Sequence, residues 1–199
     1  KKCAGIWDRE FEDLSSDIQI LNNSTFAVLD EARGEKMQEA ILAAASEGDS
    51  VGGVLETAII GMPVGVGEPW FDTVESMLSH MLFSIPAVKG VEFGAGFSIA
   101  DMRGSKANDP LRMEHGSVVS TSNNNGGVNG GITNGMPILF RTAIKPTPTI
   151  FKPQDTIDFR TMTDAVLEPK GRHDPAIVHR ARIVQDAAAA IVLCDALAL

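Results

Sequence analysis

"SNNNGGVNGGITNGMPILFRTAIKPTPT", residues 122–149, joins two kinds of sequence that need different backbones. Its first half contains five glycines and five asparagines. It disfavours a helix interior, because glycine loses much backbone entropy there and asparagine prefers turns. "MPILFRTAI", residues 136–144, then has the composition of a strand. For the Asn/Gly half two interpretations stay open: a turn-rich surface loop, or bare backbone that lets a ligand approach closely.

The strand runs directly into "KPTPT", residues 145–149. Prolines on both sides of Thr147 hold the chain extended and remove hydrogen-bond donors from a sheet edge. A lysine and two threonine hydroxyls are thereby held in a stiff array that suits contact with an anion. The alternative is that this segment simply terminates an edge strand.

Upstream, the sequence predicts two helices and two strands. Residues 30–50 are expected to form a helix with Asp30 as its N-cap and Gly48 at its C-terminal cap. A β-branched run over residues 51–60 predicts a strand. A second helix is expected from Asp72, which forms a capping-box spacing with Glu75. Strand character returns in "AVKGVEFGAGFSIADM" (residues 87–102).

Residues 103–117 are polar and are expected to be a loop. The chain closes with a long helix predicted from about Pro175, with Asp174 as its N-cap. Cys194 lies among apolar residues of this helix and is expected to be a buried, inert thiol. The predicted apolar stripe of the helix is Ile177, Ala181, Val184, Ala188, Ile191, Cys194 and Ala198.

Helices alternate with glycine-broken strands, which favours antiparallel sheet packed on helices over a doubly wound parallel sheet. The fold class is therefore expected to be α+β. No linker or repeat divides the sequence, so residues 1–199 are expected to be a single domain.

Composition excludes several classes of function. The formal net charge of −9 disfavours nucleic-acid and membrane-surface binding, since phosphate backbones need a basic face. Two cysteines form neither a disulfide framework nor a zinc spacing. No apolar run is long enough to cross a bilayer, and the first residues lack a signal-peptide core. A soluble cytoplasmic protein is expected.

"GRHDP", residues 171–175, places Arg172, His173 and Asp174 at the start of the predicted last helix. A helix N-terminus favours anions, and these residue types can bind phosphate and move protons. Other motifs fail. There is no P-loop, "GAGFSI" (residues 94–99) falls short of a dinucleotide fingerprint, and the four histidines share no metal-ligand spacing. No metal site is predicted.

Several motifs in series resemble the chorismate synthase family. They are "GDSVGGVLE" (48–56), "GVGEPWFD" (65–72), "SIPAVKGVEFGAGF" (84–97), "NNNGGVNGGITNGMPI" (123–138), "KPTPT" and "GRHDPAIVHRA" (171–181). They follow the family's order over residues 29–199, whereas the first 28 residues match only loosely.

The resemblance implies a β-α-β sandwich with helices between two antiparallel sheets, in a homotetramer. It implies conversion of the small-molecule substrate 5-enolpyruvylshikimate 3-phosphate to chorismate by anti-1,4-elimination of phosphate. Reduced FMN is required in the family, although the reaction has no net redox change.

By position, the family's FMN contacts correspond to Pro86, Ala87, Gly130, Lys145, Pro146, Thr147, Pro148, Thr149 and Arg172. Asp174 resembles the family's acidic residue near the flavin, where it could assist proton relay. Three features depart from the family pattern. Pro86 replaces an amide residue, Asp186 replaces glutamate, and "SNNNGG" (122–127) replaces an arginine-bearing version of that segment. In the family, the N-terminal half carries a Gly-Glu-Ser-His-Gly segment, an arginine-rich segment for the substrate phosphate and a Ser-Gly-Arg-Glu segment with a second catalytic histidine nearby. None of these segments, and so neither general-acid histidine, occurs in this sequence. The sequence therefore resembles a C-terminal half that is expected to be inactive alone.

Three hypotheses follow. The first is an FMN-binding part of a chorismate synthase. The second is a non-catalytic assembly or binding remnant of that fold, which would form oligomers without binding flavin. The third is an unrelated flavin-dependent redox enzyme, which NAD(P)H oxidation by the flavin-loaded chain would favour.

Overall fold

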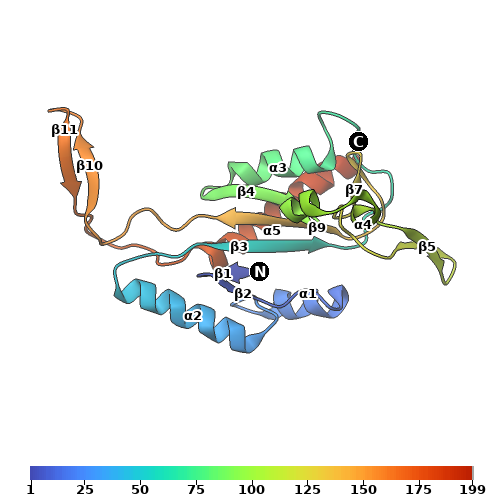
Figure 1. Cartoon of the computed structure of the whole chain (residues 1–199), viewed down its shortest axis with the longest axis horizontal. Helices are drawn as coiled ribbons and strands as arrows, with labels where there is room; N and C mark the ends of the chain where they lie inside the picture. The colour runs from blue at the N-terminus through green and yellow to red at the C-terminus, as the bar shows by residue number, and fades with distance from the viewer. Residues whose placement is uncertain (199) are drawn as a thin grey trace.

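The structure is a computed structural model that describes residues 1–198 (Figure 1). Its helices are α1 (Leu14–Asn23), α2 (Glu31–Ser46), α3 (Val74–Ser84), α4 (Gly104–Ala107) and α5 (Val178–Ala198), with a 3-10 helix η1 (Gly96–Asp101). Its strands are β1 (Lys2–Cys3), β2 (Ile6–Trp7), β3 (Gly53–Ile59), β4 (Val88–Phe93), β5 (Leu111–Glu114), β6 (Ser117–Ser120), β7 (Val128–Asn129), β8 (Ile132–Thr133), β9 (Ile138–Ile144), β10 (Gln154–Asp158) and β11 (Thr163–Leu167).

The main sheet is antiparallel throughout, in the order β2-β1-β3-β9-β4. β9 lies between β3 and β4, and its pairing with β3 runs from Gly53↔Ile144 to Ile59↔Ile138. Residues alternate along β9, so Ile138, Phe140, Thr142 and Ile144 are buried while the residues between them are more exposed. The predicted strands at residues 51–60 and 136–144, and the α+β class, are confirmed.

Helices α3 and α5 pack together against one face of this sheet (Figure 1). Their buried side chains meet the alternate residues of β9 and form one apolar cluster. The cluster includes Val74, Leu78 and Leu82 of α3, Ala188, Ala189, Val192 and Leu193 of α5, and Met37 of α2.

Helix α2 has the caps that the sequence predicts. The Asp30 carboxylate accepts a backbone hydrogen bond in the first turn. At the other end Gly48 has a φ of 68°, and the amides of Gly48 and Asp49 donate to the carbonyls of Ala45 and Ala44. This 5→2 and 6→1 pair is a Schellman motif, which turns the chain sharply out of the helix.

The last helix differs from the prediction. α5 begins at Val178 rather than Pro175, and Asp174 is not its N-cap, because its carboxylate pairs with Arg180 at 3.0 Å. Of the predicted stripe only Ala188 is fully buried, and Cys194 is exposed. The buried residues of α5 are Val178, Gln185, Ala188, Ala189, Val192, Leu193 and Ala196. Because apolar residues occur all round this helix, its sequence does not identify the face that packs on the sheet.

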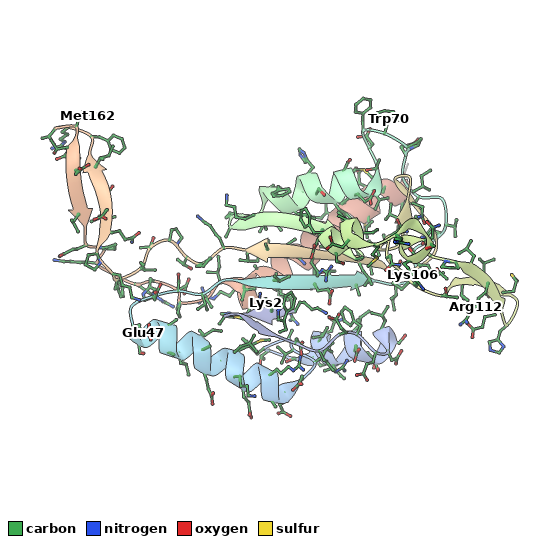
Figure 2. All side chains as sticks on the ribbon, viewed as in Figure 1. Lys2, Glu47, Trp70, Lys106, Arg112 and Met162 are labelled. Atoms are coloured by element: carbon green, nitrogen blue, oxygen red, sulfur yellow. The ribbon has the colours of Figure 1, made fainter. Side chains whose placement is uncertain are left out.

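Residues 103–117 are not a loop. They contain α4, strand β5 and the turn into β6, and β5–β6 is a hairpin in which Leu111 pairs with Ser120. His115 and Gly116 both have positive φ at the turn, as a type I′ hairpin requires. The cap of α3 also differs, since Thr73, not Asp72, accepts from the amide of Ser76. A second hairpin, β10–β11, projects from the main sheet, and Met162 lies at its tip (Figures 1 and 2).

A polar network crosses from the sheet to α5. Thr142 donates through Oγ1 to Oε1 of Gln185, whose Nε2 donates to Oγ1 of Thr57 at 2.8 Å. Thr57 donates in turn to the Asp186 carboxylate at 3.1 Å. Burial raises the pKa of Asp186. Asp186, which departs from the family's glutamate, thus bonds to β3.

Among residues 1–198, no helix is long and apolar enough to cross a membrane.

Candidate functional site

The segment that leaves α2, residues 48–52, lies between the two motifs that the sequence singles out. We call it the 48–52 turn. Figure 2 labels Glu47, the residue directly before it, at the end of α2. Both "KPTPT" and "GRHDP" hydrogen-bond to this turn, although they are far from it in sequence.

Residues 145–149 contact one side of the turn. Ser50 Oγ donates to the Thr147 carbonyl at 2.6 Å, and the amide of Phe151 donates to the Gly48 carbonyl at 2.8 Å. A Cβ on Gly52 would lie 2.5 Å from the Ile144 carbonyl oxygen and 3.0 Å from Pro146, so this close approach requires glycine. The segment therefore runs against the 48–52 turn.

Residues 173–175 contact the same turn. His173 Nε2 lies 3.2 Å from the Asp49 carbonyl oxygen, and the amide of Val51 donates to the Pro175 carbonyl at 2.8 Å. The His173 ring also meets Phe151 edge-on, with ring centroids 4.4 Å apart. "KPTPT" and "GRHDP" are thus neighbours in space.

The turn after α3 joins the same group. The amide of Lys145 donates to the Ala87 carbonyl at 2.9 Å, so Pro86 and Ala87 lie beside the start of "KPTPT". Ala87 has a φ of 75°. A left-handed backbone costs a non-glycine residue roughly 1–2 kcal/mol, and such strain is common at ligand sites.

Residues 48–52, 86–87, 145–149 and 172–175 together are called the site cluster here, and its charged side chains differ in whether they have a partner. Within residues 1–198, the exposed side chains of Lys145 and Arg172 form no hydrogen bond or ion pair. Asp49, in contrast, binds Lys152 at 2.6 Å, and this hydrogen bond lowers the pKa of its carboxyl. Two cations are therefore left available to an anionic ligand.

One hydroxyl of the cluster also lacks a partner. Oγ1 of Thr147 is buried and unpaired among the described residues. A buried polar group without a partner costs about 1–3 kcal/mol. A ligand phosphate met by a rotated Thr147 side chain would remove that cost. The two free cations and the left-handed backbone at Ala87 fit a phosphate-bearing ligand.

Gly130 lies elsewhere. It is in the turn between β7 and β8, with a φ of 60°, and its neighbour Gly131 accepts from the amide of Val74 at the start of α3. Lys145 follows the opposite end of β9, a strand that spans roughly 20 Å at ~3.3 Å per residue. The structure brings together Pro86, Ala87, Lys145, Pro146, Thr147, Pro148, Thr149, Arg172 and Asp174, but not Gly130.

Two other features do not involve these residues. A cavity of about 400 Å³ lies between α1, β3 and α5, lined by residues that include Leu21, Ile59 and Arg182, and it contains none of the predicted site residues. Within residues 1–198, no group of three histidine, cysteine, aspartate or glutamate side chains could hold a metal ion.

Sequence reasoning missed the role of Asp49, Ser50 and His173 in joining the motifs. The available signal was "GDSVGG", whose glycines at 52 and 53 have no room for a Cβ, because backbone oxygens would lie within 2.5 Å of it. Such glycines indicate close backbone packing, but they do not identify the partner segment.

The family model for chorismate synthase matches residues 7–198. The chain belongs to the chorismate synthase family. A chorismate synthase of Dehalococcoides mccartyi is 50% identical over 177 residues, which cover 89% of this chain and 49% of the relative. One from Pyrococcus abyssi is 49% identical over 177 residues, covering 89% and 50%.

A solved structure, described as a crystal structure of chorismate synthase, has a TM-score of 0.74 at 32% identity and covers 92% of this chain. The chorismate synthase fold that the motifs imply is thereby confirmed. This chain covers 48% of that solved chain and spans about half the length of the curated relatives it matches.

Proposed function

We propose that this chain is the FMN-binding part of a chorismate synthase, an enzyme that eliminates phosphate from 5-enolpyruvylshikimate 3-phosphate to give chorismate. The observation that carries the proposal is that residues 145–149 and 173–175 meet at one turn and that Ala87 bonds to Lys145. Within residues 1–198 this group includes two cations, Lys145 and Arg172, without a partner. Reduced FMN, when bound, supplies electron density to the departing phosphate.

The residues of the cluster have separate roles in this proposal. Lys145 and Arg172 bind the flavin phosphate by charge, and the threonines of "KPTPT" donate hydroxyl hydrogen bonds to it. The two prolines keep that segment extended, so little conformational entropy is lost on binding. Ala87, with a small side chain and a left-handed backbone, lets the flavin approach closely.

Asp174 is proposed to assist proton relay. It lies two residues from Arg172, and its carboxylate pairs with the exposed Arg180 at 3.0 Å in the ligand-free chain. A positioned carboxylate contributes to catalysis by holding or moving a proton.

The whole reaction is proposed to need more than this half. The resemblance assigns the general-acid histidines to segments that are not present in the sequence, so the chain alone is proposed to be inactive. The homotetramer is proposed from the family resemblance. The cytoplasmic location is proposed from composition, and the single domain over residues 1–199 from the lack of a linker. Gly130 stays a proposed FMN contact, and from its place at the other end of β9 it would meet a part of the ligand other than the phosphate.

Lys145→Ala tests the flavin site. Loss of a charge-assisted hydrogen bond costs about 1.5–3 kcal/mol, so the Kd for FMN should rise roughly 10–100-fold in a fluorescence titration at low salt. Lys106→Ala is the matched control, because it removes the same charge on α4, which lies near the start of β9 rather than its end (Figure 1), and it should leave the Kd unchanged.

Equal Kd values for the wild-type chain and Lys145→Ala would contradict this assignment of the site. Stable oligomers that bind no FMN, oxidised or reduced, would instead favour the non-catalytic assembly module.

A further inference from the structure

The 48–52 turn is the element through which the two halves of the proposed flavin site are connected. One side holds "KPTPT" through Ser50 Oγ to the Thr147 carbonyl, at 2.6 Å. The other side holds "GRHDP" through the Asp49 carbonyl to His173 and through the amide of Val51 to Pro175. The spacing between the two motifs is therefore set by this turn.

Of the two hydrogen bonds between "GRHDP" and the turn, the one from His173 depends on the side chain, whereas the one at Pro175 is between backbone atoms. A carbonyl oxygen only accepts hydrogen bonds, so His173 Nε2 carries the proton and donates to Asp49. The ring packs edge-on against Phe151, whose amide donates to the Gly48 carbonyl of the same turn. His173 is thus held both by a polar bond and by an aromatic contact.

The position of these bonds matters for the residues beside His173. The side-chain bond of His173 and the backbone bond at Pro175 tether the residues on both sides of Asp174 to the 48–52 turn. Arg172 precedes His173 directly and has no partner of its own within residues 1–198. The backbone direction at His173 therefore decides where the Arg172 guanidinium can reach.

We propose that His173 is a positioning residue, which holds Arg172 and Asp174 opposite "KPTPT" by donating to the Asp49 carbonyl. His173 itself does not touch the ligand. The proposal rests on the proposed function, because it assigns the ligand at this site to FMN. A second part of the proposal concerns the ligand-free protein. There the His173 bond stabilises the neighbouring hydrogen bond from the Val51 amide to the Pro175 carbonyl.

The test compares two substitutions in the full chain. His173→Phe keeps an aromatic ring against Phe151 but removes the donor, whereas His173→Gln places an amide donor near the position of Nε2. His80→Phe is the control, because it makes the same change at an exposed site on α3. The readouts are the Kd for FMN, the melting temperature, and hydrogen exchange of the Val51 amide without ligand.

We expect His173→Phe to raise the Kd about tenfold, the equivalent of one lost hydrogen bond, and to speed exchange of the Val51 amide about tenfold. His173→Gln should restore both to within about threefold, and His80→Phe should change neither. Ser50→Ala should also raise the Kd. Its effect should be less than additive with that of His173→Phe, because both changes loosen one connection.

Normal FMN binding by His173→Phe would overturn the proposal, as would unchanged exchange at Val51. Equal defects in the Phe and Gln variants would also overturn it, since the donor would then not be the cause. If the wild-type chain binds no FMN, the proposed function fails, and exchange at Val51 alone decides the structural claim.

Discussion

Asp174→Asn should lower turnover by about 10²–10⁴-fold, the usual contribution of a positioned proton-transfer group. The measurement is chorismate formation by a chimera in which residues 29–199 replace the matching half of the Dehalococcoides mccartyi relative, with reduced FMN supplied. Asparagine keeps the size of the side chain but cannot take a proton as a carboxylate does. The Kd for FMN should change little, because the cations Lys145 and Arg172 remain.

Two controls separate proton transfer from structure. Asp164→Asn makes the same change on β11, at an exposed residue, and should leave turnover intact. Arg180→Gln removes the ion pair to Asp174 but keeps the carboxylate, so it should cost less than Asp174→Asn. Full turnover in Asp174→Asn, or an equal loss in Arg180→Gln, would show that the carboxylate has no direct part in the reaction.

Gly94→Ala should destabilise the fold by about 2–5 kcal/mol. Gly94 has a φ of 54°, and a Cβ there would lie 2.1 Å from the Asn124 carbonyl oxygen and 2.4 Å from the amide nitrogen of Gly126. Both atoms belong to the backbone of the Asn/Gly segment, which accordingly cannot move aside as a side chain would. The measurement is urea unfolding followed by circular dichroism.

Gly61→Ala is the matched control for that prediction. Gly61 has a φ of 80°, yet a Cβ there meets nothing within 4 Å. Gly61→Ala should lower the free energy of unfolding by roughly 1–2 kcal/mol, which is the usual cost of a left-handed backbone for alanine. If the two variants unfold at the same urea concentration, the tight packing of Gly94 against residues 124–126 contributes no stability of its own.

The parts of the fold that sequence predicted correctly depend on local signals. The caps of α2 at Asp30 and Gly48 follow from residue types that favour those backbone positions. The composition of residues 136–144 predicted the strand β9. Each of these features depends on residues that are close together in the sequence, so it can be predicted without knowing the tertiary structure.

The wrong predictions concern elements whose structure is decided by tertiary contacts rather than by local sequence. α5 has apolar residues on all sides, and its contact with β3 and α3, rather than its own periodicity, selects Gln185 and Val192 for burial. The β5–β6 hairpin is short and polar, and its turn at His115 and Gly116 is a weak sequence signal.

For the candidate site, too, local features could be predicted from the sequence and long-range contacts could not. Residue types predicted that "KPTPT" and "GRHDP" suit an anion, and the family resemblance gave their individual residues. Their joining could not be predicted, because His173 and Asp49 are 124 residues apart and Ser50 and Thr147 are 97 apart. A hydrogen bond to a backbone carbonyl over such a distance leaves no pattern in one sequence.

The most direct test of the flavin site is hydrogen exchange of the chain with and without reduced FMN, resolved to single amides. The amides of Thr147, Thr149 and Arg172 should exchange about tenfold more slowly with reduced FMN present, since each belongs to a segment that contacts the ligand. Protection confined to the cavity between α1 and α5, or no protection at residues 145–149 and 172–174, would contradict the account.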